Sequence, residues 1–211
     1  MGYRQHAVCP CCGSKERERA IALFLARRMI WLRKKPRPVL HIAPEMALGQ
    51  YLSRLTKPYY VSGDKLPSRS PRPAMHQMDI THIPYPDESF DFIICNHVLE
   101  HIPDDSKAIR ELHRVLTPGG FAIIQIPYAR NLKETLEDGY STPNDRLRHY
   151  GQKDHVRLYG MDYSRRLRHC GFDLEDDTMY QRFGHDLVNV SGLIADEKLF
   201  VATKPMLMEA L

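Results

Sequence analysis

Long apolar runs are missing from this 211-residue chain, and so is a set of cysteines that could pair completely. No uninterrupted apolar stretch approaches the ~20 residues that cross a bilayer, so we expect no transmembrane protein. The first residues lack the apolar core of a secretory signal, which argues against secretion. The five cysteines are odd in number, and three crowd into residues 9–12, so we expect a reducing cytoplasm rather than a disulfide framework.

The composition that remains is that of an ordinary globular protein. Hydrophobic residues make up 43% and charged residues 27% of the chain. The length predicts one domain with a small appendage, large enough to bury its own core. We expect a Cys-containing stub and a basic helix over residues 1–36, followed by the main domain over residues 37–211.

Positive charge is concentrated near the start of the chain. Residues 1–40 hold ten Lys/Arg and two Glu, a balance of +8, so the other 171 residues carry −4 of the net +4. Such an arm could meet RNA or another anionic partner. We favour the alternative that these side chains form the solvated face of a helix, because charge runs usually do.

Strands and helices alternate along the sequence. We predict a helix over residues 15–33 with Ser14 as its cap, and further helices over 46–55, 104–116 and 161–169. Predicted strands cover residues 39–43, 59–64, 75–80, 90–96, 121–126 and 199–203, and residues 129–160 read as a polar loop. This alternation predicts an α/β fold with a mainly parallel sheet, whose ligands lie beyond the carboxyl ends of the strands.

Acidic residues stand where two predicted strands end. Asp64 closes the second strand about 20 residues after the first, the spacing at which an acid binds the hydroxyls of an adenosine ribose. Asp79 follows the third strand, where its carboxylate could accept from an adenine amino group while Ile80 covers the ring. The alternatives are ordinary: Gly63-Asp64-Lys65 is also good turn chemistry, and Asp79 suits a cap or turn equally well.

Several segments in order resemble a known family. They are Met78–Thr81, Ile83–Asp91, Asn96–Ile102 and Leu112–Gly120, and together they resemble the class I S-adenosylmethionine-dependent methyltransferases of the type 11 group. The resemblance covers about residues 37–175. It implies a Rossmann-like, seven-stranded, mostly parallel sheet with helices on both faces and an antiparallel seventh strand. It also implies S-adenosylmethionine as the cofactor, lying across the carboxyl ends of the first four strands.

The loop after the first strand departs from that family, which usually has glycines there to let the backbone approach the cofactor. Here the loop is Ala43-Pro44-Glu45-Met46-Ala47, with no glycine before Gly49. The stretch Val39–Glu45 resembles a subgroup that shares the Cys-Pro-x-Cys-Gly-Ser start, so we interpret the loop as divergent but working. Glu45 could bind the cofactor's amino group, or simply be an acid in a first helical turn.

The resemblance yields a set of expected cofactor-binding residues. These are His41, Ala43, Pro44, Glu45, Asp64, Lys65, Asp79, Ile80, Asn96 and His97.

Methyl transfer requires an aligned nucleophile and a group that removes its proton. We predict His155 as the first candidate for this base or for a substrate contact, because histidine titrates near neutral pH. His97 and Tyr128 are the other predicted catalytic residues. Further residues expected near the acceptor are Glu100, His101, Tyr150, Asp154, Arg157 and Tyr159. With eleven histidines in the chain, most must be surface or packing residues, and His97 or His101 could equally hold the start of a helix.

The Cys-x-x-Cys pair Cys9 and Cys12 is half of a zinc ribbon. No second pair follows, although His6 could add one ligand. A lone half-site is weak evidence, so we do not expect bound zinc; Cys9 and Cys12 would be its ligands if it is present. The alternatives are a bare turn or a site completed by another chain, and a catalytic thiol is the least favoured.

These observations predict a cytoplasmic methyltransferase that transfers a methyl group in line to oxygen or nitrogen of a small-molecule acceptor. One alternative is an RNA or protein methyltransferase guided by residues 1–40. The other is a protein that binds S-adenosylmethionine without turnover. We expect no membrane partner, and a monomer or homodimer.

Overall fold

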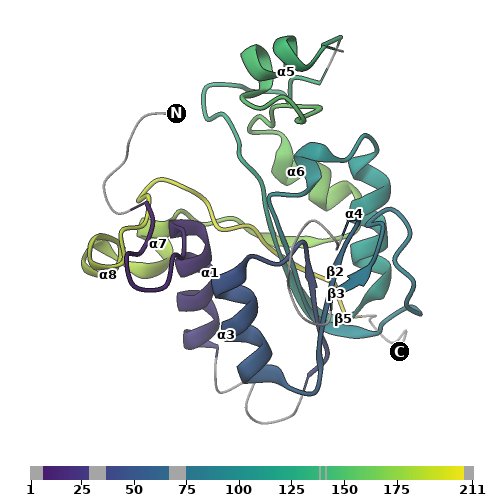
Figure 1. Ribbon diagram of the computed structural model, residues 1–211, viewed down its shortest axis with the longest axis vertical. Helices are drawn as coiled ribbons and strands as arrows, with labels where there is room; N and C mark the ends of the chain where they lie inside the picture. Colours follow the sequence, from purple (N-terminus) through teal and green to yellow (C-terminus); the bar gives the residue numbers. More distant parts are fainter. Residues whose placement is uncertain (1–6, 29–36, 67–74, 138, 141, 207–211) are drawn as a thin grey trace.

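A single seven-stranded sheet forms the centre of the molecule (Figure 1). The computed structural model describes residues 7–28, 37–66, 75–137, 139–140 and 142–206. The strand order is β3-β2-β1-β4-β5-β7-β6, and β7 pairs antiparallel with both β5 and β6 while the other neighbours are parallel. The strands are β1 Val39–Ile42, β2 Tyr60–Asp64, β3 Met75–Gln77, β4 Phe90–Asn96, β5 Leu116–Gln125, β6 Asp173–Glu175 and β7 Val201–Thr203. The expected Rossmann-like sheet with an antiparallel seventh strand is confirmed.

Helices cover both faces of this sheet. They are α1 Glu16–Arg27, α3 Met46–Thr56, α4 Asp105–Val115, α5 Pro143–Tyr150, α6 Tyr163–His169, α7 Met179–Phe183 and α8 His185–Val190, with a short 3-10 helix η2 Leu99–His101. In Figure 1, α1 and α3 lie on one side of the strands and α4 and α6 on the other, while α5 lies away from the sheet.

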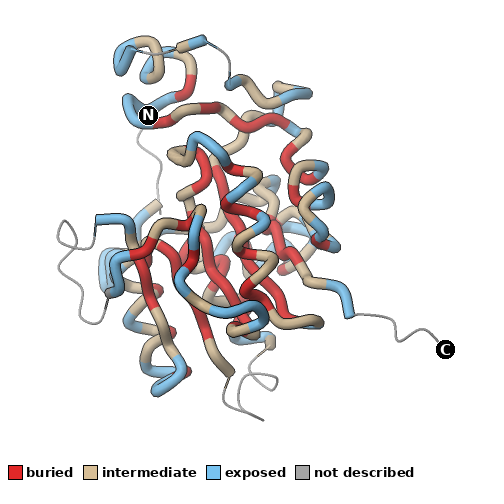
Figure 2. The backbone as a smooth tube through the Cα atoms, turned by 90° about the vertical axis from the view of Figure 1, so that its right-hand side faces the viewer, coloured by how far each residue is buried: buried red, intermediate tan, exposed pale blue. Residues whose placement is uncertain are grey.

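Alternation along the strands divides the core into two apolar layers (Figure 2). In β4, Phe92 and Ile94 pack in the layer of α1 and α3, whereas Ile93 and Cys95 pack in the layer of α4 and α6. Successive side chains of a strand point to opposite faces, so a sheet covered on both faces needs a continuous apolar run. The run from Phe90 to Cys95 meets that requirement because the five side chains other than Asp91 are buried.

The basic N-terminal helix is part of this layered structure. Ile21, Phe24 and Leu25 of α1 are buried against the sheet. Its arginines contact other elements: Arg19 donates to the carbonyl oxygens of Ser191 and Gly192, and Arg27 donates to that of Arg182. The described basic side chains of this helix therefore tie it to the domain.

The predicted bounds of that helix need correction. The helix begins after Lys15, whose backbone N–H donates to Glu18 Oε1 over 3.1 Å, so Ser14 is not its cap. Its described turns end at Arg27, and residues 29–36 lie outside the described part of the chain.

The stretch predicted as one polar loop over residues 129–160 contains a helix. The Thr142 side chain accepts from the Asp145 N–H, Pro143 occupies the first turn, and Gly151 ends the helix at φ 87°. Thr before Pro is a recognised start signal and glycine a common stop, so α5 was readable from the sequence. Three short elements, β6, α7 and α8, were also missed, because three to six residues carry little periodicity.

Two strand predictions missed an end by three or more residues, while the other strand ends agree within two. The third strand ends at Gln77 rather than residue 80, because Asp79 and His82 form a tight turn. The fifth starts at Leu116, so Thr117–Gly120 run within the strand instead of preceding it. Within the described residues, no helix is long and apolar enough to cross a membrane.

Candidate active site

Polar side chains meet where β1 and β4 end. His41 points from β1, Glu45 follows it just before α3, and Asn96 is the last residue of β4. Between them Ala43 takes the left-handed backbone conformation, with φ 45°, and its N–H donates to the carbonyl oxygen of Gly63. That conformation favours glycine, so the loop keeps the backbone path of a glycine-rich turn without the glycine. Pro44 is buried in the same loop.

Glu45 is the centre of this group. The Asn96 side-chain amide donates to its Oε1, His41 Nε2 lies 3.4 Å from its Oε2, and Arg17 Nε of α1 lies 3.6 Å from its Oε1. His41 in turn contacts the Tyr60 hydroxyl through Nδ1 at 3.0 Å. Burial alone would raise the pKa of Glu45, but the hydrogen bond and charge of His41, with Arg17, bring the pKa below its ordinary value. Glu45 is therefore a carboxylate at neutral pH.

This group contains polar atoms that the described residues do not satisfy. Asn96 Oδ1 is buried and accepts no hydrogen bond from the described residues, and the buried atoms Glu45 Oε2 and His41 Nε2 have only their long 3.4 Å contact with each other. Two of the three are obligatory acceptors. Because a buried polar atom without a partner costs about 1–3 kcal/mol, such a concentration indicates a place for a ligand that donates hydrogen bonds.

The expected nucleoside-binding residues lie at the neighbouring strand ends. Asp64, at the end of β2, uses Oδ1 to accept the Leu66 N–H over 2.9 Å. Asp79 accepts from the N–H and hydroxyl of Thr81 through Oδ1, and Lys65 Nζ lies 3.4 Å from its Oδ2. The Thr81 hydrogen bonds lower the pKa of Asp79.

The turn role weighed for Asp79 is thus observed, while its adenine contact stays a prediction. Ile80 packs in the core cluster, 4% exposed.

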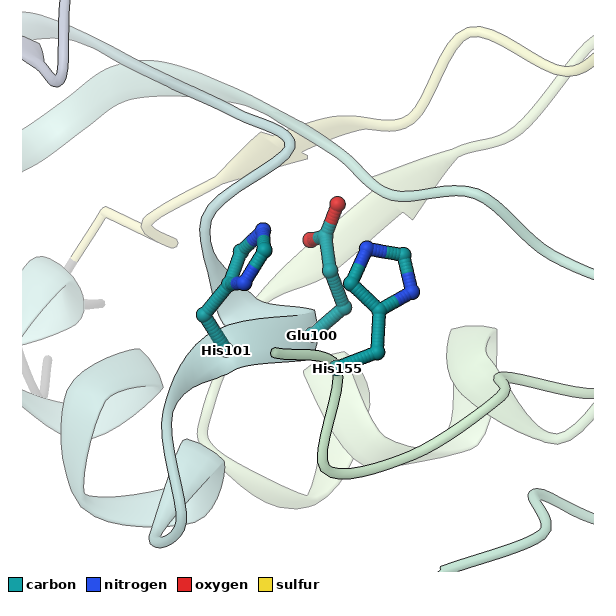
Figure 3. A group of neighbouring side chains, drawn as sticks. All are labelled: Glu100, His101 and His155. Atoms are coloured by element: carbon teal, nitrogen blue, oxygen red, sulfur yellow. The ribbon is translucent and has the colours of Figure 1, made fainter. Parts of the chain in front are cut away.

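A second polar group follows directly along the chain from β4. His97 has φ 55°, and its Nδ1 lies 3.4 Å from Glu100 Oε1. Glu100 and His101 belong to η2, and His155 comes from the segment after α5 (Figure 3). The structure therefore brings four predicted acceptor-side residues together from two distant stretches of sequence.

Other predicted acceptor-side residues have structural partners instead. Arg157 is buried and donates to the carbonyl oxygens of Leu99 and Pro103 and to Glu137. The Tyr159 hydroxyl donates to Asp105 over 2.8 Å, and burial raises the pKa of this phenol well above its usual value. Both residues fasten the 129–160 segment to the domain.

Two of the remaining acceptor-side candidates, Tyr150 and Asp154, contact the second polar group. Tyr150 is buried and its carbonyl oxygen contacts His155, whereas Asp154 is exposed beside His101. Tyr128 packs edge-on against Phe200, and burial raises its pKa, so it is a neutral phenol at neutral pH. A phenol of this kind donates a hydrogen bond but is a poor base.

The cysteine pair lies apart from both groups. All five cysteines are free thiols, and Cys12 donates to the Ser14 hydroxyl over 3.2 Å. Within the described ranges, no third His, Cys, Asp or Glu completes a metal-binding group with Cys9 and Cys12. His6, the other candidate ligand, is outside those ranges.

Known proteins are similar to this chain in sequence and in fold. Residues 56–124 match the family model described as methyltransferase domain, a stretch that includes β2, β4 and most of β5. Sequence relatives include a Mycolicibacterium smegmatis protein named "probable S-adenosylmethionine-dependent methyltransferase", 29% identical over 52% of this chain and 38% of its own. They also include a Listeria welshimeri demethylmenaquinone methyltransferase, 37% identical over 22% of each chain.

Solved structures extend the similarity to the fold. An S-adenosylmethionine-dependent methyltransferase from Archaeoglobus fulgidus matches 88% of this chain and 94% of its own with a TM-score of 0.58 at 15% identity. A chain of the complex between the Haloferax volcanii Trm112 methyltransferase activator and a methyltransferase matches 92% and 95%, with a TM-score of 0.54 at 14% identity. The chain therefore shares the Rossmann-like fold of these methyltransferase structures. It spans less than two fifths of the length of either sequence relative.

Proposed function

We propose that this protein transfers the methyl group of S-adenosylmethionine to an oxygen or nitrogen atom of a small-molecule acceptor. The observation that carries the proposal is the buried polar group at the carboxyl ends of β1 and β4, in which Asn96 Oδ1 accepts no hydrogen bond from the described residues and Glu45 Oε2 has only a long contact with His41. Ligands of open α/β sheets bind at this edge, where the strand order reverses, and β1 and β4 are the strands on either side of the reversal.

These atoms fit the cofactor. Its amino-acid part carries an ammonium group, which donates three hydrogen bonds and pairs with a carboxylate. Glu45, ionised and held by His41 and Asn96, offers that carboxylate. Asp64 at the end of β2 keeps one carboxylate oxygen beyond its bond to Leu66, as ribose binding requires.

When bound, the cofactor supplies an electrophilic methyl group on a sulfonium. A bond forms from the acceptor atom to the methyl carbon, and the carbon–sulfur bond breaks with its electron pair remaining on sulfur. The acceptor's proton must leave to a base. Glu100 Oε2 and His155 Nε2 are buried beside the end of β4 and are both free of hydrogen bonds to described residues, so basic atoms face this side.

The acceptor side supports a small molecule rather than RNA. The segment that follows α5 is fastened beside η2, because Arg157 donates to the carbonyl oxygens of Leu99 and Pro103. The arginines Arg17, Arg19 and Arg27 of α1 contact Glu45 or backbone carbonyl oxygens, and Arg28 after the helix contacts Glu175, so each has a partner within the molecule. Demethylmenaquinone methyltransferase, named among the relatives, also takes its name from a small molecule.

Methyl-labelled S-adenosylmethionine tests this proposal. The full chain is incubated with the labelled cofactor and either a low-mass metabolite extract or total RNA, and label is measured in each fraction. We expect label in the low-mass fraction and about tenfold less with Glu45→Gln, a loss of roughly 1.4 kcal/mol. Label confined to RNA would establish the alternative acceptor. No transfer to either, despite cofactor binding, would favour a non-catalytic binding protein.

A further inference from the structure

A cluster of three metal-ligand residues lies beside the end of β4. One ligand atom from each of Glu100, His101 and His155 lies within 4.8 Å of the other two. In the part of the chain that the structure describes, this is the one group of three or more such residues. Figure 3 shows the Glu100 carboxylate between the two imidazole rings, with His155 reaching it from a separate segment. We propose that these three residues bind a divalent first-row transition-metal ion.

The first argument is the state of the two buried members. Glu100 and His155 are 1% and 3% exposed, yet Glu100 Oε2 and His155 Nε2 make no hydrogen bond to any described residue. Burial removes water from both atoms, and leaving such atoms unpaired is costly. Each of the two atoms offers a lone pair, so one bound cation satisfies both of them.

The second argument is how the imidazoles are held. His155 Nδ1 lies 3.0 Å from the Tyr150 carbonyl oxygen, an acceptor only, which assigns the proton to Nδ1 and the lone pair to Nε2. His101 Nδ1 lies 3.3 Å from a carboxylate oxygen of Asp154, which leaves its Nε2 available in the same way. Metal-binding histidines almost always donate their other ring N–H to a carbonyl or carboxylate.

The geometry also indicates the kind of ion. Zn²⁺ with ligands at about 2.0–2.2 Å in a tetrahedral site separates its ligand atoms by about 3.4 Å, so the three side chains need to close by roughly an ångström. Two imidazoles and one carboxylate suit Zn²⁺, Mn²⁺ or Fe²⁺ better than Mg²⁺, which prefers oxygen ligands. His101 is partly exposed, so the fourth position is open to water or a ligand.

The ion's role rests on the proposed function. The cluster follows Asn96 by four residues and lies next to the candidate cofactor group, so a metal-bound acceptor hydroxyl would lie on the acceptor side. A bound cation lowers the pKa of such a hydroxyl, which then loses its proton to solvent before the oxygen attacks the methyl carbon. With the ion in place, Glu100 and His155 act as ligands.

The test is calorimetric titration of metal-stripped protein with Zn²⁺, Mn²⁺ or Mg²⁺, without cofactor. Carrying the titration out in a Cys9→Ser/Cys12→Ser background removes the other candidate zinc ligands. We expect one ion per chain for Zn²⁺ or Mn²⁺ and weaker Mg²⁺ binding. Absence of saturable binding of either transition metal overturns the proposal, whatever the result for the cofactor, whose affinity is measured separately with adenosylhomocysteine.

Variants identify the ligands. Glu100→Gln and His155→Ala should each weaken binding at least about tenfold, since even outer partners of metal ligands act on that scale. His185→Ala, at an exposed histidine of α8, is the matched control and should leave affinity unchanged. Of the three ligand variants, His101→Ala is expected to disturb folding least, because the His101 ring is partly solvent-accessible. In Co²⁺-loaded protein, the visible absorption bands should change in the three ligand variants. If the bands and the metal affinity are unchanged in all three variants, the ion binds elsewhere and the ligand assignment is refuted.

Discussion

The two halves of the candidate site are built in different ways. The cofactor side consists of residues at the ends of β1, β2 and β4, whose positions follow from the strand register. The acceptor side brings η2 together with a segment that is distant in the sequence, and in the described residues the two are not paired as strands of a sheet. The buried Arg157 side chain holds them in place through the Leu99 carbonyl oxygen and Glu137. A sheet edge thus positions polar groups by topology, whereas the acceptor side depends on individual side chains.

The largest expected effect tests this dependence at Arg157. Replacing Arg157 with Met removes the buried guanidinium that donates to the carbonyl oxygens of Leu99 and Pro103 and leaves Glu137 with Arg166 as its remaining arginine partner. Breaking a buried charged network costs about 3–5 kcal/mol, so the free energy of unfolding in urea should fall by that amount. Arg165→Met, which removes an exposed ion pair with Glu134, is the control and should cost at most about 1 kcal/mol. Equal losses of unfolding free energy in both variants would contradict the claim that the acceptor side depends on individual buried side chains.

On the cofactor side, Asp64→Ala should weaken adenosylhomocysteine binding without unfolding the protein. The loss of hydrogen bonds to a charged group is worth about 1.5–3 kcal/mol, measured as the change in Kd by calorimetry. Asp186→Ala removes a fully exposed carboxylate of α8 and should leave Kd unchanged. An unaltered Kd in Asp64→Ala would take Asp64 out of the site.

A smaller, pH-dependent effect is expected at Glu45. Its folded-state pKa lies below the ordinary value of 4.5, so its contribution to stability is complete above that value and disappears as pH falls through the folded pKa. The difference in unfolding free energy between wild type and Glu45→Gln should therefore be constant from pH 7 to about 5 and shrink below about 4.5. A gap that widens on acidification would mean that the pKa is raised instead.

The difference between the two sides of the candidate site also explains which features the sequence could predict. Apolar runs such as Phe92–Cys95 predicted the sheet, because a buried parallel strand is a continuous apolar stretch of sequence. The spacing of Asp64 predicted the polar edge where the strands end. The left-handed turn at Ala43 left none, since alanine does not signal positive φ. The meeting of Glu100 with His155, 55 residues apart, depends on how Arg157 and Tyr159 fold the intervening segment back, and local pattern does not encode that path.

Adenosylhomocysteine titration of the wild-type chain tests the central claim most directly. The structure offers a preformed edge with Glu45 ionised and the buried Asn96 Oδ1 unsatisfied by the described residues, so we predict saturable binding with one ligand per chain. Glu45→Gln should bind about tenfold more weakly, which corresponds to about 1.4 kcal/mol. An absence of saturable binding by the folded wild-type chain would contradict the assignment of this edge as a cofactor site, and with it the proposed methyl transfer.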